Sequence, residues 1–118
     1  PGAGGQGPGQ LQALALQQSI VDAEEASFTE MLRRAIQMDA ATIDRLQTTL
    51  ASDDRIVSLR ESIQRAARVR MDEGVITASD YVDRQTETLT AEFDRARHRV
   101  ELTHAQARLL TTLGLEVQ

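Results

Sequence analysis

Apolar residues recur through the first two thirds of the chain with the period of a helix that packs along another helix. One row repeats every seven residues with an alternate position between the repeats: Ile36, Ile43, Leu50 and Val57, with Leu32 and Leu46. A second row lies on an adjacent face: Phe28, Ala35, Ile56 and Ile63. Because proline is absent after residue 10, we expect one unbroken helix over residues 11–73 with apolar contacts on more than one side.

A second helix is expected over residues 79–113, after a short turn at residues 74–78. Gly74 suits the left-handed position that follows a helix C-terminus, where a Cβ is costly. Thr77 and Asp80 have the spacing of a capping box, in which a hydroxyl and a carboxylate each accept a backbone N–H at a helix N-terminus. Gly114 then ends or kinks the second helix. Its apolar stripe, expected to face the first helix, consists of Val82, Leu89, Ala96, Ala107 and Leu110, with Phe93 and Val100.

These elements predict an all-α fold, a long antiparallel two-helix coiled-coil hairpin. In the register that the turn allows, Leu89 lies opposite Ile63. The same register brings two acids to two arginines: Asp53 and Asp54, with Arg97 and Arg99. The first helix is longer than the second, so residues 11–37 overhang and need another partner. We therefore expect the hairpin to self-associate into a helical bundle.

Composition narrows the function. The 118 residues carry a net charge of −5, which argues against a nucleic-acid binder, and only 3% are aromatic, which favours a thin, elongated core. Cysteine is absent, so the sequence offers no disulfide and no thiolate metal site. No run of about 20 apolar residues is present, so we expect no membrane-spanning helix. Residues 1–10, rich in glycine and proline, are expected to form a flexible linker.

No group of residues in the sequence predicts an enzyme, a cofactor site or a metal site. His98 and His104 are six residues apart and lie on different faces of the second helix. A helical metal pair needs a spacing of three or four, so we expect both histidines to be solvated. No glycine-rich phosphate loop follows a strand-like segment either.

Acidic residues gather near the turn: Asp72, Glu73, Asp80 and Asp83. Asp80 and Asp83 are three residues apart, which places them on one face of the first turns of the second helix. In one interpretation they stabilise the positive end of that helix dipole. In the other, copies from several subunits form an acidic ring at a pore mouth, which selects or gates by charge. The sequence leaves both interpretations open.

The stretch around the turn, AARVRMDEGVITASDYVDRQTE (residues 66–87), and the end of the second helix, AQARLLTTLG (residues 105–114), resemble the TolC-type outer membrane efflux proteins. In that family a glycine, an isoleucine, a serine or threonine and an aspartate in this order mark the tip of a periplasmic helical hairpin. The resemblance implies a trimeric export channel whose periplasmic tunnel is built of packed hairpins. This chain is then expected to be one such hairpin of a longer protein.

The resemblance also implies partners, a location and site residues. The family's tip turn, which docks on a periplasmic adaptor protein, is matched here by Gly74, Val75, Ile76 and Thr77. The acidic positions that can line the closed entrance are matched by Asp80 and Asp83. The adaptor links such a channel to an inner-membrane transporter, and the channel exports small molecules or proteins. The expected location is the periplasm and outer membrane of a Gram-negative bacterium, with membrane contact only through parts of the channel outside this hairpin.

Two other functions remain open. The hairpin of the periplasmic adaptor itself carries a similar turn, but its flanks are lipoyl-like segments rich in glycine and valine, which this sequence lacks. The chain could also be a plain coiled-coil spacer or dimerisation module. Such a spacer has no need for the apolar pair Val75 and Ile76 at an exposed tip, where small polar residues would be more soluble.

Overall fold

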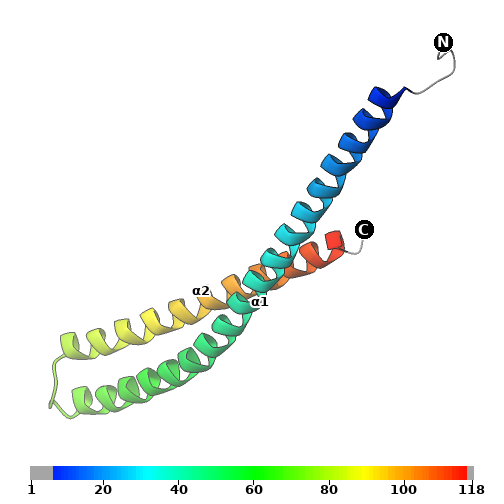
Figure 1. Cartoon of the computed structure of the whole chain (residues 1–118). Helices are drawn as coiled ribbons and strands as arrows, with labels where there is room; N and C mark the ends of the chain where they lie inside the picture. The colour runs from blue at the N-terminus through cyan, green and yellow to red at the C-terminus, as the bar shows by residue number, and fades with distance from the viewer. Residues whose placement is uncertain (1–6, 117–118) are drawn as a thin grey trace.

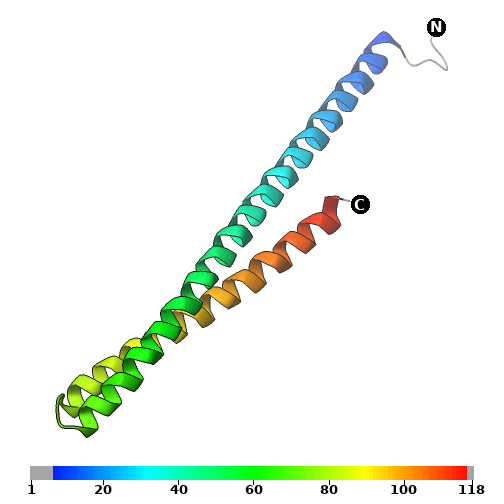
Figure 2. The same ribbon diagram turned by 90° about the horizontal axis from the view of Figure 1, so that it is seen from below.

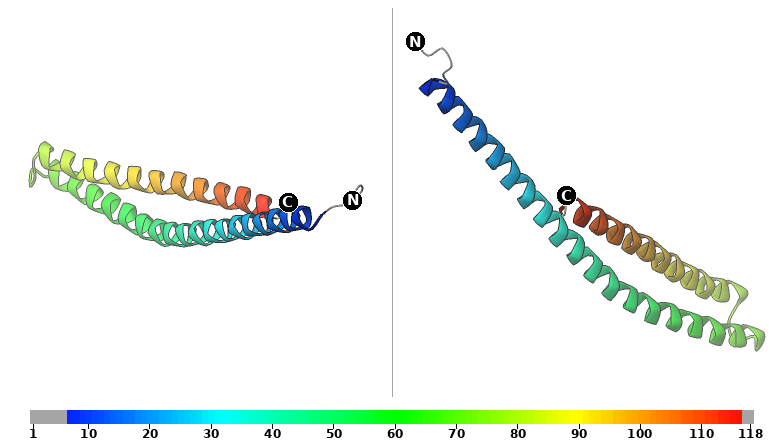
Figure 3. Two further views of the ribbon diagram at one scale, coloured as in Figure 1. Left: turned by 45° about the horizontal axis from the view of Figure 1, so that its top comes forward. Right: turned by 90° about the vertical axis from the view of Figure 1, so that its right-hand side faces the viewer.

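The computed structural model describes residues 7–116, which form two helices joined by one reversal of the chain (Figure 1). Helix α1 runs over Pro8–Asp72 and helix α2 over Ala78–Glu116. The helices lie side by side and antiparallel, and three further views show the same long pair (Figures 2 and 3). No strand occurs within residues 7–116. The expected all-α helical hairpin is confirmed.

Helix α1 begins at Pro8, ahead of the start at residue 11 that the sequence predicted. Pro8 occupies the first helical position, where its fixed φ suits a helix and its missing N–H leaves no donor unpaired. The side-chain oxygen of Gln10 accepts the N–H of Gly7 at 3.2 Å. Residues 8–10 therefore belong to α1 instead of the expected linker, and residues 1–6 of that linker lie outside the described residues. At about 1.5 Å per residue, the 65 residues of α1 span roughly 98 Å.

Helix α2 continues past the glycine at which we expected it to end. It runs through Gly114 to Glu116, so the expected stop at this residue is wrong. The physical reason is that a glycine inside a helix costs only about 1 kcal/mol relative to alanine, which neighbouring helical residues outweigh. Among residues 7–116, Gly74 alone has a positive φ, and that is the backbone feature that ends a helix.

The core is a thin seam between the two helices. Its buried residues are Leu46, Asp53, Val57 and Ala67 from α1, and Thr88, Ala91 and Ala105 from α2. Leu46 and Val57 are 0% and 2% exposed, as the heptad row of α1 predicted. Ile43 and Leu50, from the same row, are half-buried beside them. Because α2 contributes small side chains, its backbone can lie close to the larger residues of α1.

The apolar stripe that we expected α2 to turn toward α1 faces away from it. Its large members are between 50% and 74% exposed: Val82, Leu89, Phe93, Val100 and Leu110. We call these five residues the outer stripe. The expected contact between Leu89 and Ile63 is therefore wrong, because Leu89 lies on the face of α2 that points away from α1. The physical reason is that α2 packs through the small residues Thr88, Ala91 and Ala105, which permit closer approach of the helices than a row of large side chains would.

Ion pairs between the helices show that the expected axial register is within a few residues of the observed one. Arg60 donates to Glu87 at 2.9 Å, and Arg108 lies 3.4 Å from Asp39. The pairing predicted near the middle of the hairpin is correct only in part. Asp54 contacts Arg99 at 3.9 Å and Arg95 at 3.3 Å. These pairs are partly exposed, so each contributes less than about 1 kcal/mol.

Two residues of the predicted ion-pair cluster have other partners. Arg97 pairs within its own helix, with Asp94 and Glu101 at 3.3 Å each. Asp53 faces His98, whose Nδ1 lies 2.6 Å from Oδ2 of the carboxylate. The side chains of His98 and Asp53 are only 17% and 10% exposed, so the expectation of a solvated histidine is wrong at this position. A histidine beside small residues of the seam fits between the helices and meets the carboxylate across it.

The N-terminal part of α1 has no α2 beside it (Figure 1). Every residue of the segment 8–29 is exposed, and we call this segment the overhang. Its large apolar side chains are Leu11, Leu14, Leu16, Ile20, Val21 and Phe28. A helix that exposes so many large apolar residues is only marginally stable alone in water, because most helix stability in proteins comes from burial of an apolar face.

Candidate docking site at the hairpin tip

The end of α1 is closed by a Schellman motif, which fixes the direction in which the chain leaves the helix. Gly74 has a φ of +76°, and its N–H donates to the carbonyl of Met71 at 2.9 Å. The N–H of Val75 donates to the carbonyl of Arg70 at 2.8 Å. These are the two hydrogen bonds that define the motif. They satisfy carbonyls that the helix end would otherwise leave unpaired, so the backbone of the turn is well determined.

Replacing Gly74 with alanine is expected to lower the free energy of unfolding by about 1 kcal/mol, because a Cβ is unfavourable in the left-handed conformation. An added Cβ would meet no atom within 4 Å, so the backbone conformation is the whole cause. Gly114→Ala is the matched control, since that glycine is helical and equally open; it should be neutral or slightly stabilising. Urea unfolding followed by circular dichroism at one protein concentration measures both. Equal effects of the two variants would contradict the assignment.

The start of α2 carries the predicted capping box, which is confirmed. The N–H of Asp80 donates to the hydroxyl of Thr77 at 3.1 Å, and the N–H of Thr77 donates to Oδ2 of Asp80 at 3.0 Å. The backbone N–H of Thr77, then its hydroxyl and the charge of Arg84, lower the pKa of Asp80 below its ordinary value of 3.8. Asp80 therefore stabilises the helix N-terminus as a carboxylate.

Acidification is expected to loosen this capping box. Because the pKa of Asp80 is lowered in the folded hairpin, its contribution to stability is fully present above the unfolded pKa of about 3.9. It is lost as the pH falls through the lower folded value. Hydrogen exchange of the Thr77 amide should therefore accelerate, relative to the amides of mid-helix α1, as the pH is lowered below about 4. In Asp80→Asn this relative acceleration should be absent, and its persistence there would assign the effect to another group.

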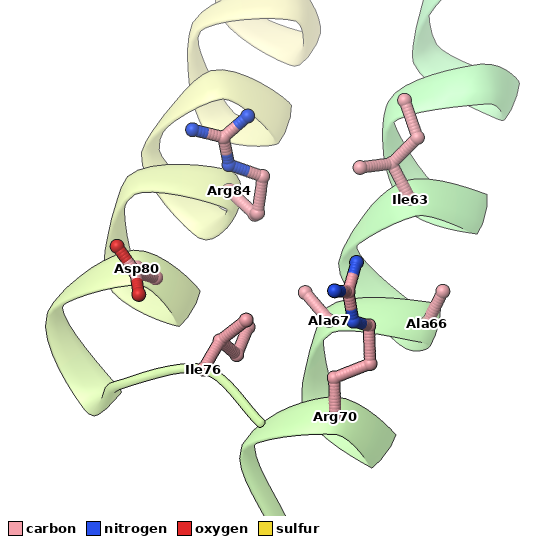
Figure 4. Close-up of a pocket in the computed structure, with 7 residues that line it drawn as sticks. All are labelled: Ile63, Ala66, Ala67, Arg70, Ile76, Asp80 and Arg84. Carbon is pink, nitrogen blue, oxygen red and sulfur yellow. The ribbon is translucent and has the colours of Figure 1, made fainter. Parts of the chain in front are cut away.

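The two apolar residues of the turn point in different directions. Val75 is 60% exposed at the tip, whereas Ile76 is half-buried and turns toward the space between the helices (Figure 4). There it lines a groove of about 390 Å³, which we call the tip groove. The complete lining is Ile63, Ala66, Ala67, Arg70, Ile76, Asp80 and Arg84. The turn thus presents one apolar side chain to solvent and places the other in an open groove.

The opposite side of the tip is polar. Gln64 donates to the hydroxyl of Tyr81 at 3.3 Å, and the guanidinium of Arg68 lies 5.7 Å from the centre of the Tyr81 ring. The hydrogen bond from Gln64, followed by the interaction with the Arg68 guanidinium, lowers the pKa of Tyr81 below its ordinary value of 10.0. These contacts join α1 to the first turn of α2. They stabilise the tip and leave the apolar groove on the other side free.

The structure places the remaining predicted site residues around this tip. Asp83 is exposed and has no hydrogen-bond partner among residues 7–116, so its carboxylate is available to neighbouring molecules. Asp80 has the capping function already described, and the pore-ring interpretation of both acids stays a prediction. Within residues 7–116, no three side chains of the metal-binding types lie together, and neither helix combines the length and apolar character needed to cross a bilayer.

Sequence reasoning missed two cationic residues of the tip groove, Arg70 and Arg84. Arg70 lies in the last turn of α1, where a basic residue is expected for helix stability alone. Arg84 belongs to a row of α2 that repeats every seven residues and continues through Ala91, His98 and Ala105. That row could have been found by its period. It was overlooked because its members are small or polar and a more apolar row lies beside it.

Chemically, the tip offers binding surface. It combines an exposed apolar side chain, an open groove with an apolar floor, and several charged groups at the groove edge. In comparisons with models of protein families, with curated proteins and with solved structures, no match to this chain was found.

Proposed function

We propose that this hairpin is a wall segment of the periplasmic tunnel of an outer membrane export channel. Its tip docks on a periplasmic adaptor protein, which connects the channel to an inner-membrane transporter. The proposal combines the resemblance of residues 66–87 and 105–114 to TolC-type proteins with the surfaces that the folded hairpin leaves uncovered. In this role the hairpin provides structure and binding surfaces, and the channel transports small molecules or proteins.

The observation that carries the proposal is the outer stripe of α2. At about 100° per residue, Phe93 lies on the side of α2 opposite Ala91, which is buried against α1. Phe93 is 74% exposed, and Leu89 and Val100 flank it along the helix. Contiguous exposed apolar surface of this kind marks an interaction site on a soluble protein. A second helix from another copy or another segment would bury it.

A further apolar surface lies on a different side of the hairpin. Ile56 and Leu59 of α1 are 47% and 60% exposed. We call these two residues the α1 flank. It borders the grooves between the helices, because Ile56 lines one of them together with Thr90 of α2. The outer stripe and the α1 flank therefore offer two unlike surfaces.

Two unlike apolar surfaces on one unit favour a closed ring over a symmetric pair. When the surface of one copy binds a different surface of the next, head-to-tail contacts form and the assembly closes by rotation. A spacer or dimerisation module needs only one self-complementary surface. A tunnel wall needs a neighbour on each side, and the overhang adds a third surface that needs cover. This is the reason to prefer the tunnel segment.

The docking role rests on the tip. Val75 is 60% exposed in the turn that joins α1 to α2, and this turn lies at one end of the elongated hairpin (Figure 1). The Schellman motif and the capping box hold the backbone on either side of it, so its position is fixed before a partner arrives. An apolar side chain on a preorganised turn is a suitable contact for another protein.

In the protein expressed in cells, replacing Val75 and Ile76 with serine is expected to abolish export and to leave assembly intact. The substitution removes two apolar side chains from the docking turn and leaves the glycine and the capping residues in place. Accumulation of a fluorescent efflux substrate in cells measures export, and cross-linking to the adaptor measures docking. Circular dichroism and sedimentation of the purified variant are the controls for folding and assembly. Normal export with normal docking would contradict the proposal and favour a spacer.

A further inference from the structure

We propose that the tip groove binds an acidic amphipathic helix of the docking partner, with an apolar side chain in the groove and a carboxylate on Arg70 and Arg84. This inference rests on the proposed function, since it specifies the chemistry of the partner that docks at the tip. It concerns a surface beside the turn, and the turn residue Val75 has no part in it.

The floor of the tip groove is apolar and large enough for one or two side chains. Ile63, Ala66 and Ala67 of α1 and Ile76 of the turn form it, in a volume of about 390 Å³. That volume lies in the range of about 300–1,000 Å³ in which proteins bind organic groups. The two alanines leave room over α1, while Ile63 and Ile76 close the two ends (Figure 4). A leucine-sized side chain entering there would contact these apolar side chains on the floor of the groove.

The charge at the groove edge is positive and incompletely neutralised. Arg70 has no ion-pair partner among the described residues 7–116. Arg84 lies 3.5 Å from Oε2 of Glu87, but the same oxygen already accepts a hydrogen bond from Arg60 at 2.9 Å. Asp80 accepts the backbone N–H of Thr77 in the capping box. The two guanidinium groups therefore retain donors for an incoming carboxylate.

The two arginines come from opposite walls of the groove (Figure 4). Arg70 belongs to the last turn of α1 and Arg84 to the second turn of α2, so an acidic side chain of a helix in the groove would have a guanidinium group on either wall. Guanidinium groups bind carboxylates through short, charge-assisted hydrogen bonds, often two at a time.

A helix fits this site better than an extended strand. The groove runs between two helices and exposes no strand edge, and a docked helix places side chains three or four positions apart on one face. One of these positions would carry the apolar residue over Ala66 and Ala67, and the other the acid. The acid that lines the groove does not favour a basic helix instead, because Asp80 already accepts the N–H of Thr77 in the capping box and faces two arginines.

Three alanine-based helical peptides test the inference against the isotopically labelled chain by nuclear magnetic resonance. Each carries one central leucine and, four residues away, Glu, Gln or Lys. We expect the Glu peptide to shift the resonances of Ala66, Ala67 and Ile76 and to bind at least about tenfold more tightly than the Gln peptide, because its hydrogen bonds are charge-assisted. The Lys peptide should bind most weakly.

Two matched double variants separate the groove from general charge. Arg70→Gln with Arg84→Gln should remove the preference for the Glu peptide, whereas Arg55→Gln with Arg65→Gln removes the same charge outside the groove and should preserve it. Equal binding of all three peptides, shifts confined to other residues, or loss of the preference in both variants would overturn the inference. The assay needs neither assembly nor export. Its failure therefore leaves the tunnel proposal standing, and a failed export test leaves this binding result standing.

Discussion

Replacing Leu89 and Phe93 with glutamine is expected to turn the assembled chain into single hairpins without unfolding them. Both side chains belong to the outer stripe, and both are at least half exposed in the hairpin, so the seam does not depend on them. Burying a large apolar side chain contributes about 1.5–3 kcal/mol, so losing two of them should weaken each subunit contact by roughly 100-fold or more. Sedimentation equilibrium measures the mass, and circular dichroism measures the helix content.

Val69→Gln is the control for this experiment. Val69 is 55% exposed on α1 and belongs to neither the outer stripe nor the α1 flank. It should leave the mass of the assembly unchanged. If the Leu89 and Phe93 variant keeps the mass of the parent chain, the outer stripe is not a subunit contact. The tunnel proposal then loses the observation that carries it.

Replacing His98 with alanine is expected to lower the free energy of unfolding by about 2 kcal/mol, because it leaves the Asp53 carboxylate buried without its partner. The two groups are 2.6 Å apart and both are more than four-fifths covered by the seam. Urea unfolding at fixed protein concentration, where the linear extrapolation applies, measures the change. No contact outside the seam is altered by this substitution.

A double variant and a control test the same pair further. Replacing Asp53 and His98 together with leucine should recover the stability of the parent chain or exceed it, since apolar replacements of buried ion pairs often do. Arg97→Ala serves as a control, because that arginine pairs only within α2 and is exposed, so its loss should change stability by less than about 0.5 kcal/mol. If His98→Ala and Arg97→Ala change the free energy of unfolding equally, the buried pair contributes no more to stability than an exposed ion pair.

The sequence predicted the tip most accurately, because its chemistry is local. A glycine in the left-handed conformation and a Thr–Asp capping box each act within five residues, so the residue types determine the geometry. Gly74, Thr77 and Asp80 all lie in the conformations expected of them. The heptad of α1 was also readable, since Leu46 and Val57 are large and at most 2% exposed.

The face of α2 could not be predicted by the same reasoning. Hydrophobic periodicity identifies the most apolar side of a helix, and on α2 that side is the outer stripe. The helices pack instead through Thr88, Ala91 and Ala105, with His98 between them. The rule that the most apolar face is buried within the chain holds only where the chain supplies all the neighbours. A hairpin that associates with further helices divides its apolar surface among them.

The tip groove was hidden from the sequence for a related reason. It depends on the orientation of Ile76 and on two arginines that lie on different helices. Each arginine has an ordinary local explanation, and only the packing of α1 against α2 places both beside one groove. Many weak contacts together determine the axial register of a coiled coil. Residue pairs between its helices are therefore identified from the folded structure.

The single reversal of this chain also sets the order in which its contacts can form. Gln64 and Tyr81, near the turn, are 17 residues apart in sequence, whereas Arg108 and Asp39, near the open end, are 69 apart. Closing the shorter loop loses less chain entropy, and each further turn of helix then extends a loop that is already closed. We therefore expect the hairpin to form from Gly74 outward, with its last cross-helix contacts beside the overhang, whose apolar side chains α2 does not cover.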